Sequence, residues 1–424
     1  MVPLTGQAAA LLALLRRNSD FRRLFFASVV SLCGDWFAYV AVSGLVIDDT
    51  GREGAGALVF AASVLPVFLA APIAGVVADR VDRKRLMIAA DVLRVIPALG
   101  LLVADAHHLP LLALACVAMI AALSAFFEPV TAAVLPNVVD LRDLSLAQST
   151  MGAVWGSMLF VGAAIGGLVA AGLGRPASFV ANAATFALSA VLVWRVRAPF
   201  QQRRTVALPS PWRAIADVWQ FVRPRKVSYT LLVTKAGVGV GNGLVGLLPA
   251  YALAVFGAGD LGIGVLVAGR GLGALIGPFI GRALVRDSGQ RLLLITGLSI
   301  VSYGVCYLLL PSAGTIAAAA LCVVCAHAGG GSQWMLSTFG LQVTTPDGIR
   351  GRVMSADFGF ATLAMGVSSL VAGGLTEVIG LRPTSYALST VAVAAGLGWL
   401  WWTRDLWSSP RDPLTPPAPD ASLG

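Results

Sequence analysis

Long apolar runs separated by short polar stretches dominate the chain between residues 24 and 402. A transmembrane helix needs about 20 predominantly apolar residues to cross the hydrocarbon core of a bilayer. By that rule the pattern predicts twelve membrane-spanning helices, at residues 24–47, 57–78, 86–104, 110–127, 150–172, 177–195, 228–255, 261–284, 291–310, 315–339, 354–378 and 384–402.

One long polar and basic stretch divides these spans into six and six. Most other connections are short and carry turn-forming residues, as in Gly174-Arg175-Pro176. The long stretch contains an amphipathic segment at 212–222, and the chain ends in a proline-rich tail of the kind that remains disordered. We therefore expect a first six-helix bundle at 1–195, a cytoplasmic linker at 196–227, a second bundle at 228–404 and a disordered cytoplasmic tail at 405–424.

Composition also favours a membrane protein. Residues of the AVILMFWYC set make up 57% of the chain and charged residues 12%, whereas soluble domains have about 25% charged residues. Such a chain has too little polar surface to cover a soluble globule, which excludes soluble enzymes, nucleic-acid-binding domains and disordered chains. The five cysteines lie inside apolar runs, which indicates packing rather than disulfides or a metal site. We expect no metal and no cofactor.

The positive charges are placed asymmetrically. With the N-terminus inside the cell, most of the 30 lysines and arginines fall on cytoplasmic loops. Arg52, Arg175 and Arg382 fall outside, and Lys235 and Arg270 fall within the membrane. Because cytoplasmic loops are enriched in lysine and arginine, we expect both termini in the cytoplasm and a multi-pass protein of the cell membrane. The net charge of +9 then reflects topology and requires no nucleic-acid partner.

The two predicted halves share several features. Each has a basic loop after its second span, at 79–85 and 282–291, and a double glycine in its fifth span, at 166–167 and 373–374. Two parallel six-helix repeats around a central cavity are one known architecture of secondary transporters. The sequence thus predicts an all-α integral membrane protein made of two pseudo-symmetric six-helix bundles.

Two loops carry the most specific motifs. Residues 75–85 read Gly-Val-Val-Ala-Asp-Arg-Val-Asp-Arg-Lys-Arg and resemble the loop 2–3 signature of the major facilitator superfamily, with Asp82 in place of the usual glycine. Residues 342–355 resemble the loop 10–11 segment of the drug:proton antiporter branch, which includes bacterial macrolide-efflux and enterobactin-exporter proteins. The stretches 34–36 and 182–186 fit the same branch.

The resemblance covers the chain to about residue 404 and implies the major facilitator fold and proton-coupled export. The sequence departs from the branch at two places. Span 4 carries no arginine, so the branch's span-4 proton-relay motif is absent, and Ala163 stands where the span-5 antiporter motif usually has proline.

The basic loop after span 2 predicts a cytoplasmic gate. Asp79 could accept hydrogen bonds from free N–H groups at the start of span 11, near 353–356, where the helix dipole favours negative charge. Arg83 could pair with Glu128 at the end of span 4. The alternative is that the basic residues of this loop form no gate and only set the orientation of the protein in the membrane. The predicted gate comprises Gly75, Asp79, Arg80, Arg83, Glu128, Arg350 and Arg352.

Ionisable residues inside the predicted spans are functional candidates because their burial is costly. Asp35 lies near the middle of span 1, so it must face a cavity, be paired or be protonated, and we expect it to couple transport to protons. A structural hydrogen bond between helices is the alternative. Arg270 in span 8 and Lys235 in span 7 could be counter-ions to Asp35 or contacts for an anionic substrate, and Lys235 could instead extend toward the interface.

Span 10 carries a second candidate for proton transfer, His327, followed by three consecutive glycines that would loosen the helix. The alternative is that His327 transfers no proton and only forms a hydrogen bond in the core. We expect Asn242, Gln333 and Trp334 to line the substrate cavity together with Lys235 and Arg270.

The leading functional hypothesis is proton-coupled export of a small hydrophobic or amphipathic compound by alternating access, because an apolar cavity with few polar groups suits such ligands. Dedicated export of one metabolite, siderophore or lysolipid is the alternative within the same class. A membrane-embedded enzyme would need a paired catalytic constellation, and a channel would need a filter or charge ring; neither is visible in the sequence. The expected partners are the substrate, protons and the bilayer, with the protein acting as a monomer.

Overall fold

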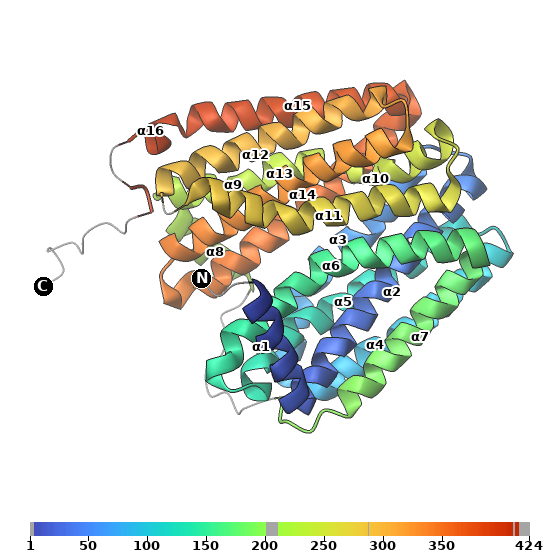
Figure 1. The fold of residues 1–424 in the computed structure, drawn as a ribbon, viewed down its shortest axis with the longest axis horizontal. Helices are drawn as coiled ribbons and strands as arrows, with labels where there is room; N and C mark the ends of the chain where they lie inside the picture. The colour runs from blue at the N-terminus through green and yellow to red at the C-terminus, as the bar shows by residue number, and fades with distance from the viewer. Residues whose placement is uncertain (1–3, 201–210, 287, 410–411, 415–424) are drawn as a thin grey trace, which may run out of the picture.

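The computed structural model describes residues 4–200, 211–286, 288–409 and 412–414, which form helices and short connections without a strand (Figure 1). The first half contains α1 (Leu4–Arg17), α2 (Ser19–Thr50), α3 (Ala55–Arg80), α4 (Arg83–Ala106), α5 (Pro110–Val138), α6 (Leu141–Leu173) and α7 (Arg175–Trp194). The second half contains α8 (Pro211–Val222), α9 (Lys226–Gly241), α10 (Gly243–Ala250), η1 (Tyr251–Val255), α11 (Gly259–Val285), α12 (Gly289–Leu309), η2 (Leu310–Ser312), α13 (Ile316–Thr344), α14 (Asp347–Ile379), α15 (Leu381–Trp402) and α16 (Arg404–Trp407).

Local sequence explains where several of these helices begin and end. The side chain of Asn18 accepts hydrogen bonds from the N–H groups of Asp20 and Phe21 and so caps α2. Gly51, with φ of 64°, ends the same helix in the left-handed conformation that glycine adopts without steric cost. Pro110 begins α5 at a position where its missing N–H would have had no helical partner.

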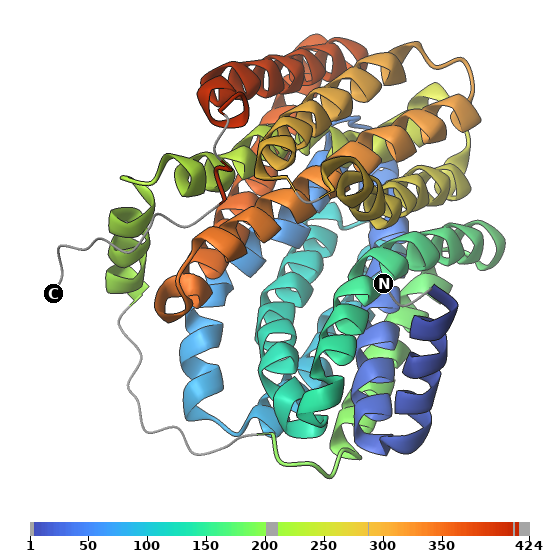
Figure 2. The same cartoon turned by 60° about the vertical axis from the view of Figure 1, so that its left-hand side comes forward.

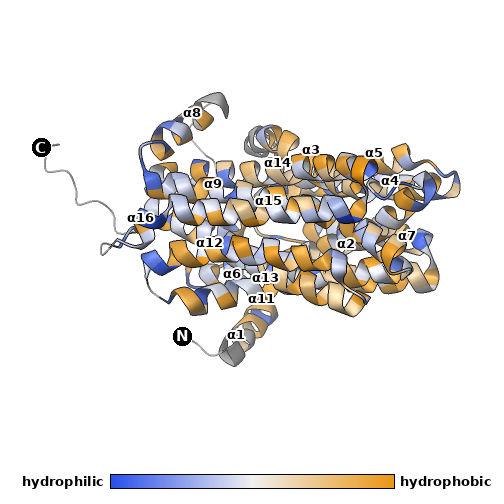
Figure 3. Cartoon of the chain, turned by 90° about the horizontal axis from the view of Figure 1, so that it is seen from above, coloured by the Kyte–Doolittle hydropathy of each residue, from blue (hydrophilic) through white to orange (hydrophobic). Residues whose placement is uncertain are grey.

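Within the described residues, eleven helical segments are long and apolar enough to cross a membrane: the six helices α2 to α7, the segment from α9 to η1, and four that contain α11, α12, α13 and α14. The last of the long helices, α15, has 22 residues and packs along α12, but Arg382, Ser385 and Ser389 lower its mean hydropathy. It occupies the place of the twelfth predicted span. The prediction of an all-α membrane protein is confirmed, and Figure 3 shows the apolar exterior of the bundle.

The predicted seventh span is not one continuous helix. It consists of α9, α10 and the π-helical turn η1, with a break at Asn242 between Gly241 and Gly243. Gly243 donates its N–H to the hydroxyl of Ser368 on α14, 2.9 Å away, so the break is held by the neighbouring helix. An interrupted helix is tolerated at membrane depth where neighbouring side chains bind the freed backbone groups.

The segments at the chain ends differ from expectation. The N-terminal stretch forms α1, which the apolar pattern did not predict. The predicted disordered tail begins with an ordered part, because Gly289 donates its N–H to Asp412 and Leu414 packs against the second half. Residues 201–210 of the linker and 415–424 of the tail lie outside the described residues.

Both α1 and α16 lie at the same end of the bundle, together with α8 (Figure 1, Figure 3). We call this the termini end, and we call the opposite end, which contains Thr50, Ala106 and Arg175, the far end. Figure 2 shows the first half, coloured blue to green, grouped on one side and most of the second half, coloured yellow to red, on the other.

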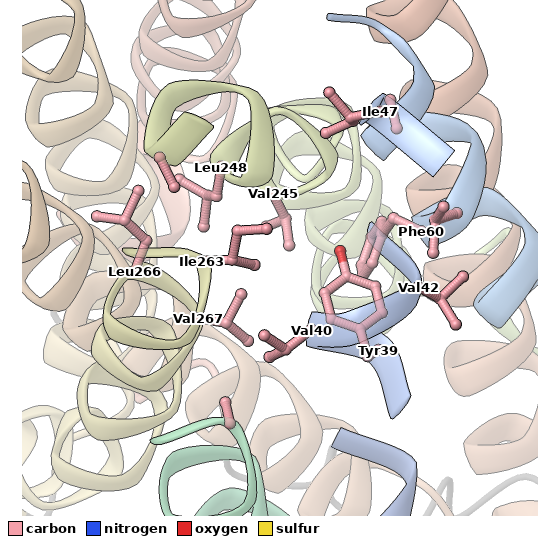
Figure 4. Packing of buried hydrophobic residues seen from close by; sticks show 14 of the residues in the cluster. Tyr39, Val40, Val42, Ile47, Phe60, Val245, Leu248, Ile263, Leu266 and Val267 are labelled. Carbon is pink, nitrogen blue, oxygen red and sulfur yellow. The ribbon is translucent and has the colours of Figure 1, made fainter. Parts of the chain in front are cut away.

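The hydrophobic cores show how the halves meet. One cluster combines residues of both halves, and Figure 4 shows Tyr39 and Phe60 of the first half beside Val245, Ile263 and Val267 of the second. Two further clusters each belong to one half. One contains residues of α1, α2, α4, α5, α6 and α7, and the other contains residues of α8, α9, α11, α12, α13, α14 and α15. The halves therefore share a core toward the far end and have separate cores at the termini end.

Candidate functional site

The two halves approach each other to backbone contact toward the far end. A Cβ atom placed on Gly264 of α11 would lie 2.6 Å from the Cα of Gly167 on α6, which is closer than real Cβ atoms come. Only glycine at both positions allows this approach. Of the double glycine noted in span 5, Gly167 thus serves contact between the halves, whereas Gly166 packs against Phe37 of α2 within the first half.

Ion pairs join the halves at the same end. Arg175 at the start of α7 binds both carboxylate oxygens of Asp260 on α11, at 2.9 and 3.1 Å, and reaches Asp48 of α2 at 2.6 Å. Arg52 pairs with Glu377 at the end of α14 at 3.0 Å, and Glu377 also accepts the N–H of Gly54. A bidentate arginine–carboxylate pair is geometrically specific, so these contacts favour the closed far end.

The first half contains a buried charge network around Arg94, a residue of predicted span 3 that was not among the candidates from the sequence. Arg94 of α4 is 1% exposed and forms an ion pair with Asp91, one turn earlier on the same helix. Its Nη1 lies 3.9 Å from Oδ2 of Asp35, and its guanidinium lies over the ring of Phe186 at 4.4 Å. The hydroxyl of Ser189 on α7 donates to Asp91 at 2.7 Å.

This network (Asp35, Asp91, Arg94 and Ser189) links three helices through groups that are expensive to bury alone. A guanidinium in the membrane interior is costly to bury without an anion, and two carboxylates here share one cation. Adding a proton to either carboxylate would change the charge balance at Arg94. The arrangement can therefore respond to protonation.

The second half contains a separate buried ion pair. Lys235 of α9 and Asp357 of α14 are 1% and 3% exposed, and their charged atoms lie 3.2 Å apart. Lys235 also donates to the hydroxyl of Thr338 at 3.0 Å, and its Nζ lies 3.6 Å from the centroid of the Trp334 ring. The partner of Lys235 is therefore Asp357, rather than Asp35 as one of the sequence hypotheses proposed.

Arg270 occupies the junction of the two halves, near the middle of α11. It is 5% exposed, and its guanidinium carbon lies 5.5 Å from the Trp36 ring and 5.2 Å from the Phe60 ring, both of the first half. His327, on the neighbouring α13, shares a 2.8 Å hydrogen bond with the hydroxyl of Tyr307 and packs edge-on against Tyr303.

Of the remaining cavity candidates, Gln333 is buried within the second half, where it donates to the hydroxyl of Thr234. Asn242 is buried at the break in the seventh span.

The tyrosines beside His327, Tyr303 and Tyr307, were not among the candidates from the sequence, since an aromatic residue in an apolar run gives no separate signal.

The predicted gate residues lie at the termini end. Arg83 is 9% exposed and donates to the carbonyl of Ala133 at 3.4 Å, Arg80 is exposed, and Arg350 binds Asp347 at 2.7 Å and the carbonyl of Thr345. Arg352 pairs with Asp217 of α8, which brings the linker helix onto α14. The side chains of three further gate candidates lie outside the described part of the chain: Gly75, Asp79 and Glu128.

One detail of the gate prediction is wrong. α14 begins at Asp347, and the N–H groups of Ile349 and Arg350 already donate to the carbonyl of Pro346, so the free N–H groups of this helix lie at its first two residues and not at residues 353–356 as the apolar pattern indicated. The helix continues beyond the apolar run, and the N–H groups of residues 353–356 fall within the helical hydrogen-bonding pattern.

Two six-helix halves that meet at one end, with buried charges inside their spans, define a membrane transporter of the secondary type. The sequence model of the major facilitator superfamily matches residues 24–360, and the chain belongs to that superfamily. The resemblance to this superfamily is thereby confirmed.

Individual proteins agree with this assignment. The chain is 28% identical over 395 residues to the multidrug efflux pump Tap of Mycolicibacterium fortuitum, covering 88% of this chain and 93% of Tap. It is 25% identical over 366 residues to BacE of Bacillus subtilis, assigned as an exporter of bacilysin, covering 84% of this chain and 88% of BacE. The structure of the nucleoside transporter NupG shares the fold, with a TM-score of 0.72 at 10% identity over 90% of this chain and 99% of that one.

Proposed function

We propose that the protein exports a small hydrophobic or amphipathic compound across the cell membrane in exchange for protons. Both termini would lie in the cytoplasm, as the distribution of lysine and arginine indicates. The termini end is then the cytoplasmic end, and the structure corresponds to a state closed toward the outside. The protein would act as a transporter without catalytic residues and as a monomer.

The observation that carries this proposal is the division of the core. A shared core toward the far end and separate cores at the termini end are the arrangement expected when two rigid halves alternate access around a central site. The glycine contact and the ion pairs of Arg175 and Arg52 would have to break for the far end to open. The export activities named for Tap and BacE support the direction of transport.

Proton coupling is assigned to the network around Arg94. Asp35 lies at mid-length of α2, within 3.9 Å of Arg94. Protonation of Asp35 would remove its negative charge, and Asp91 would then be the one carboxylate of this network that still pairs with Arg94. Such a change in pairing would alter how α2 packs on α4, and α2 also contacts the second half. His327 is the second candidate, because protonation would give both ring nitrogens a hydrogen to donate and so change its hydrogen bond with Tyr307.

The cytoplasmic gate is assigned to the loop after α3 and the start of α14. When the termini end closes, the motif containing Asp79 would meet the first two turns of α14, where Arg350 and Arg352 lie. Arg352 now holds Asp217 of the linker helix, so this pair would tie the linker to the movement of α14.

Transport into proteoliposomes with an imposed pH gradient tests the proposal. Two amphipathic compounds, the anion dansylglycine and its neutral amide, are offered, and at least one of them should move against its concentration gradient only when the protein and the pH gradient are both present. A polar sugar serves as the control and should not move. Movement of one polar metabolite, with no movement of either amphipathic compound, would replace the proposal with dedicated metabolite export.

A further inference from the structure

Arg270 is a buried cation that has no anionic partner among the described residues. None of the ion pairs in this part of the chain includes Arg270, and its Nη1 is buried without a hydrogen-bond partner. This distinguishes it from two other cations buried within spans, Arg94 and Lys235, which each have a carboxylate. An unpaired guanidinium in the membrane interior costs several kcal/mol.

Other unpaired donors surround this guanidinium. Nε1 of Trp36 and the hydroxyls of Tyr39 and Tyr303 are also buried without hydrogen-bond partners in the described part of the chain. Trp36 lies beside Arg270 through the stacking contact of its ring, and the two tyrosines lie close enough to act on Arg270 electrostatically. Two of these residues come from α2 and one from α12, so both halves contribute.

Aromatic rings account for part of the surroundings of Arg270 and cannot supply hydrogen-bond acceptors of the required strength. The rings of Trp36 and Phe60 lie over the guanidinium at 5.5 and 5.2 Å, and a cation over an aromatic face is attracted to it. Ring faces leave Nη1 of Arg270 and Nε1 of Trp36 without a hydrogen-bond partner, and every unpaired group named here can donate. A ligand with an anionic head and an aromatic or apolar body would complement both features.

We propose that this cluster (Arg270, Trp36, Tyr39, Tyr303 and Phe60) binds the anionic group of the transported compound, so that the substrate is an amphipathic anion. The inference rests on the proposed export function and adds the charge of the substrate to it. A carboxylate would accept from the guanidinium and from Nε1 of Trp36, while the body of the compound stacks on the rings. Arg270 lies near the middle of the 27-residue α11, the mid-membrane depth at which secondary transporters bind substrates.

The position at the junction of the halves gives the cluster a second property. Trp36 and Phe60 belong to the half that must separate from α11 when the far end opens. Opening would uncover Arg270 to the outside, and water would then compete for its hydrogen bonds. The bound anion would thus be held more weakly in the outward-open state, which favours release outside the cell.

A matched set of fluorescent probes tests this inference: dansylglycine, which is an anion, its neutral amide dansylglycinamide, and a cationic dansyl amine. Binding to the purified protein in nanodiscs is measured by fluorescence titration. The wild type should bind dansylglycine about 10- to 100-fold more tightly than the amide, as expected for hydrogen bonds to charged groups.

Variants distinguish a specific contribution of Arg270 to anion binding from general effects of substitution on the protein. Arg270→Gln should reduce binding of dansylglycine to the level of the amide, and Arg270→Lys should retain part of the preference because it keeps the charge but loses the planar fork. Trp36→Phe keeps an aromatic face, though a smaller one, removes one donor and should weaken binding of the anion more than binding of the amide. Arg282→Gln removes an exposed charge from the same helix and should change nothing.

Equal binding of the anion and the amide by the wild type would overturn the inference, as would a preference that survives in Arg270→Gln. If Arg270→Gln does not fold, Arg270→Lys and Trp36→Phe provide the test, and an unchanged preference for the anion in both of them would overturn the inference. Transport of the same three compounds under a pH gradient separates the two proposals. Movement of the amine or amide without the anion would refute the anion site and leave export intact, whereas Arg270-dependent binding without any movement would refute export and leave the site.

Discussion

Replacing Asp357 with asparagine would leave Lys235 as a buried cation without a carboxylate. Both residues are nearly inaccessible, at 1% exposure for Lys235 and 3% for Asp357, so water cannot take the place of the lost partner. Breaking a buried pair in this way costs about 3–5 kcal/mol. The remaining contacts of Lys235 with Thr338 and the Trp334 ring reduce the loss, and we expect about 3 kcal/mol of destabilisation for Asp357→Asn.

The double variant Lys235→Met/Asp357→Asn should be more stable than Asp357→Asn, because it removes the unpaired charge. Unfolding in mixed micelles by increasing SDS measures the four free energies, and we expect a coupling energy of about 2–3 kcal/mol. The surface pair Lys226–Asp405, with its charged atoms 2.7 Å apart and exposures of 43% and 58%, is the matched control and should couple by about 0–1 kcal/mol. Equal coupling in the two pairs would refute the account of Lys235 as a desolvated cation.

Three further predictions address the far end and the topology. Gly264→Ala should keep the halves apart at the far end, because its Cβ would lie 2.6 Å from Gly167, whereas a Cβ added by Gly172→Ala meets no atom within 4 Å. The distance between spin labels at the exposed residues Leu173 and Val378, one in each half, should lengthen only for Gly264→Ala, and an unchanged distance would contradict the contact. The hydrogen bond between His108 and Asp49 raises the pKa of His108 above the usual 6.5. This contact therefore stabilises the fold below pH 6.5, and the stabilisation is lost as the pH rises through the raised pKa. An NMR titration of His108 should show the raised pKa, and Asp49→Asn should abolish the shift. Single-cysteine labelling should find residues 80–85 inside and residues 50–54 outside, and labelling of position 83 from outside would overturn the orientation.

Much of the fold could be predicted because membrane-spanning helices are recognisable by the length of their apolar runs. The predicted span 110–127 became α5, Pro110–Val138, and the extra residues show that a helix continues beyond its apolar part. The break at Asn242 was not predicted, because glycine and asparagine within an apolar run do not specify where a helix is interrupted. That break depends on the hydroxyl of Ser368 from another helix.

The site was predicted only in part. Asp35, Lys235 and Arg270 could be found because any charge inside a span is conspicuous, and Arg94 could have been found by the same rule. Their partners could not be found in this way. Whether Asp35 lies near Arg94, or Lys235 near Asp357, depends on how helices distant in the sequence pack and rotate against each other. The closed far end was also beyond prediction, since one sequence must support both conformations of a transporter.

Proton movement coupled to transport tests the central claim most directly. The protein is reconstituted into liposomes that contain a pH-sensitive dye, a pH gradient is imposed, and a transported compound is added. The wild type should move protons down their gradient as the compound moves up its own. Asp35→Asn should abolish this uphill movement while downhill exchange survives in part, because the asparagine can neither bind nor release a proton. Uphill transport by Asp35→Asn at the rate of the wild type would show that Asp35 is structural and would contradict the account.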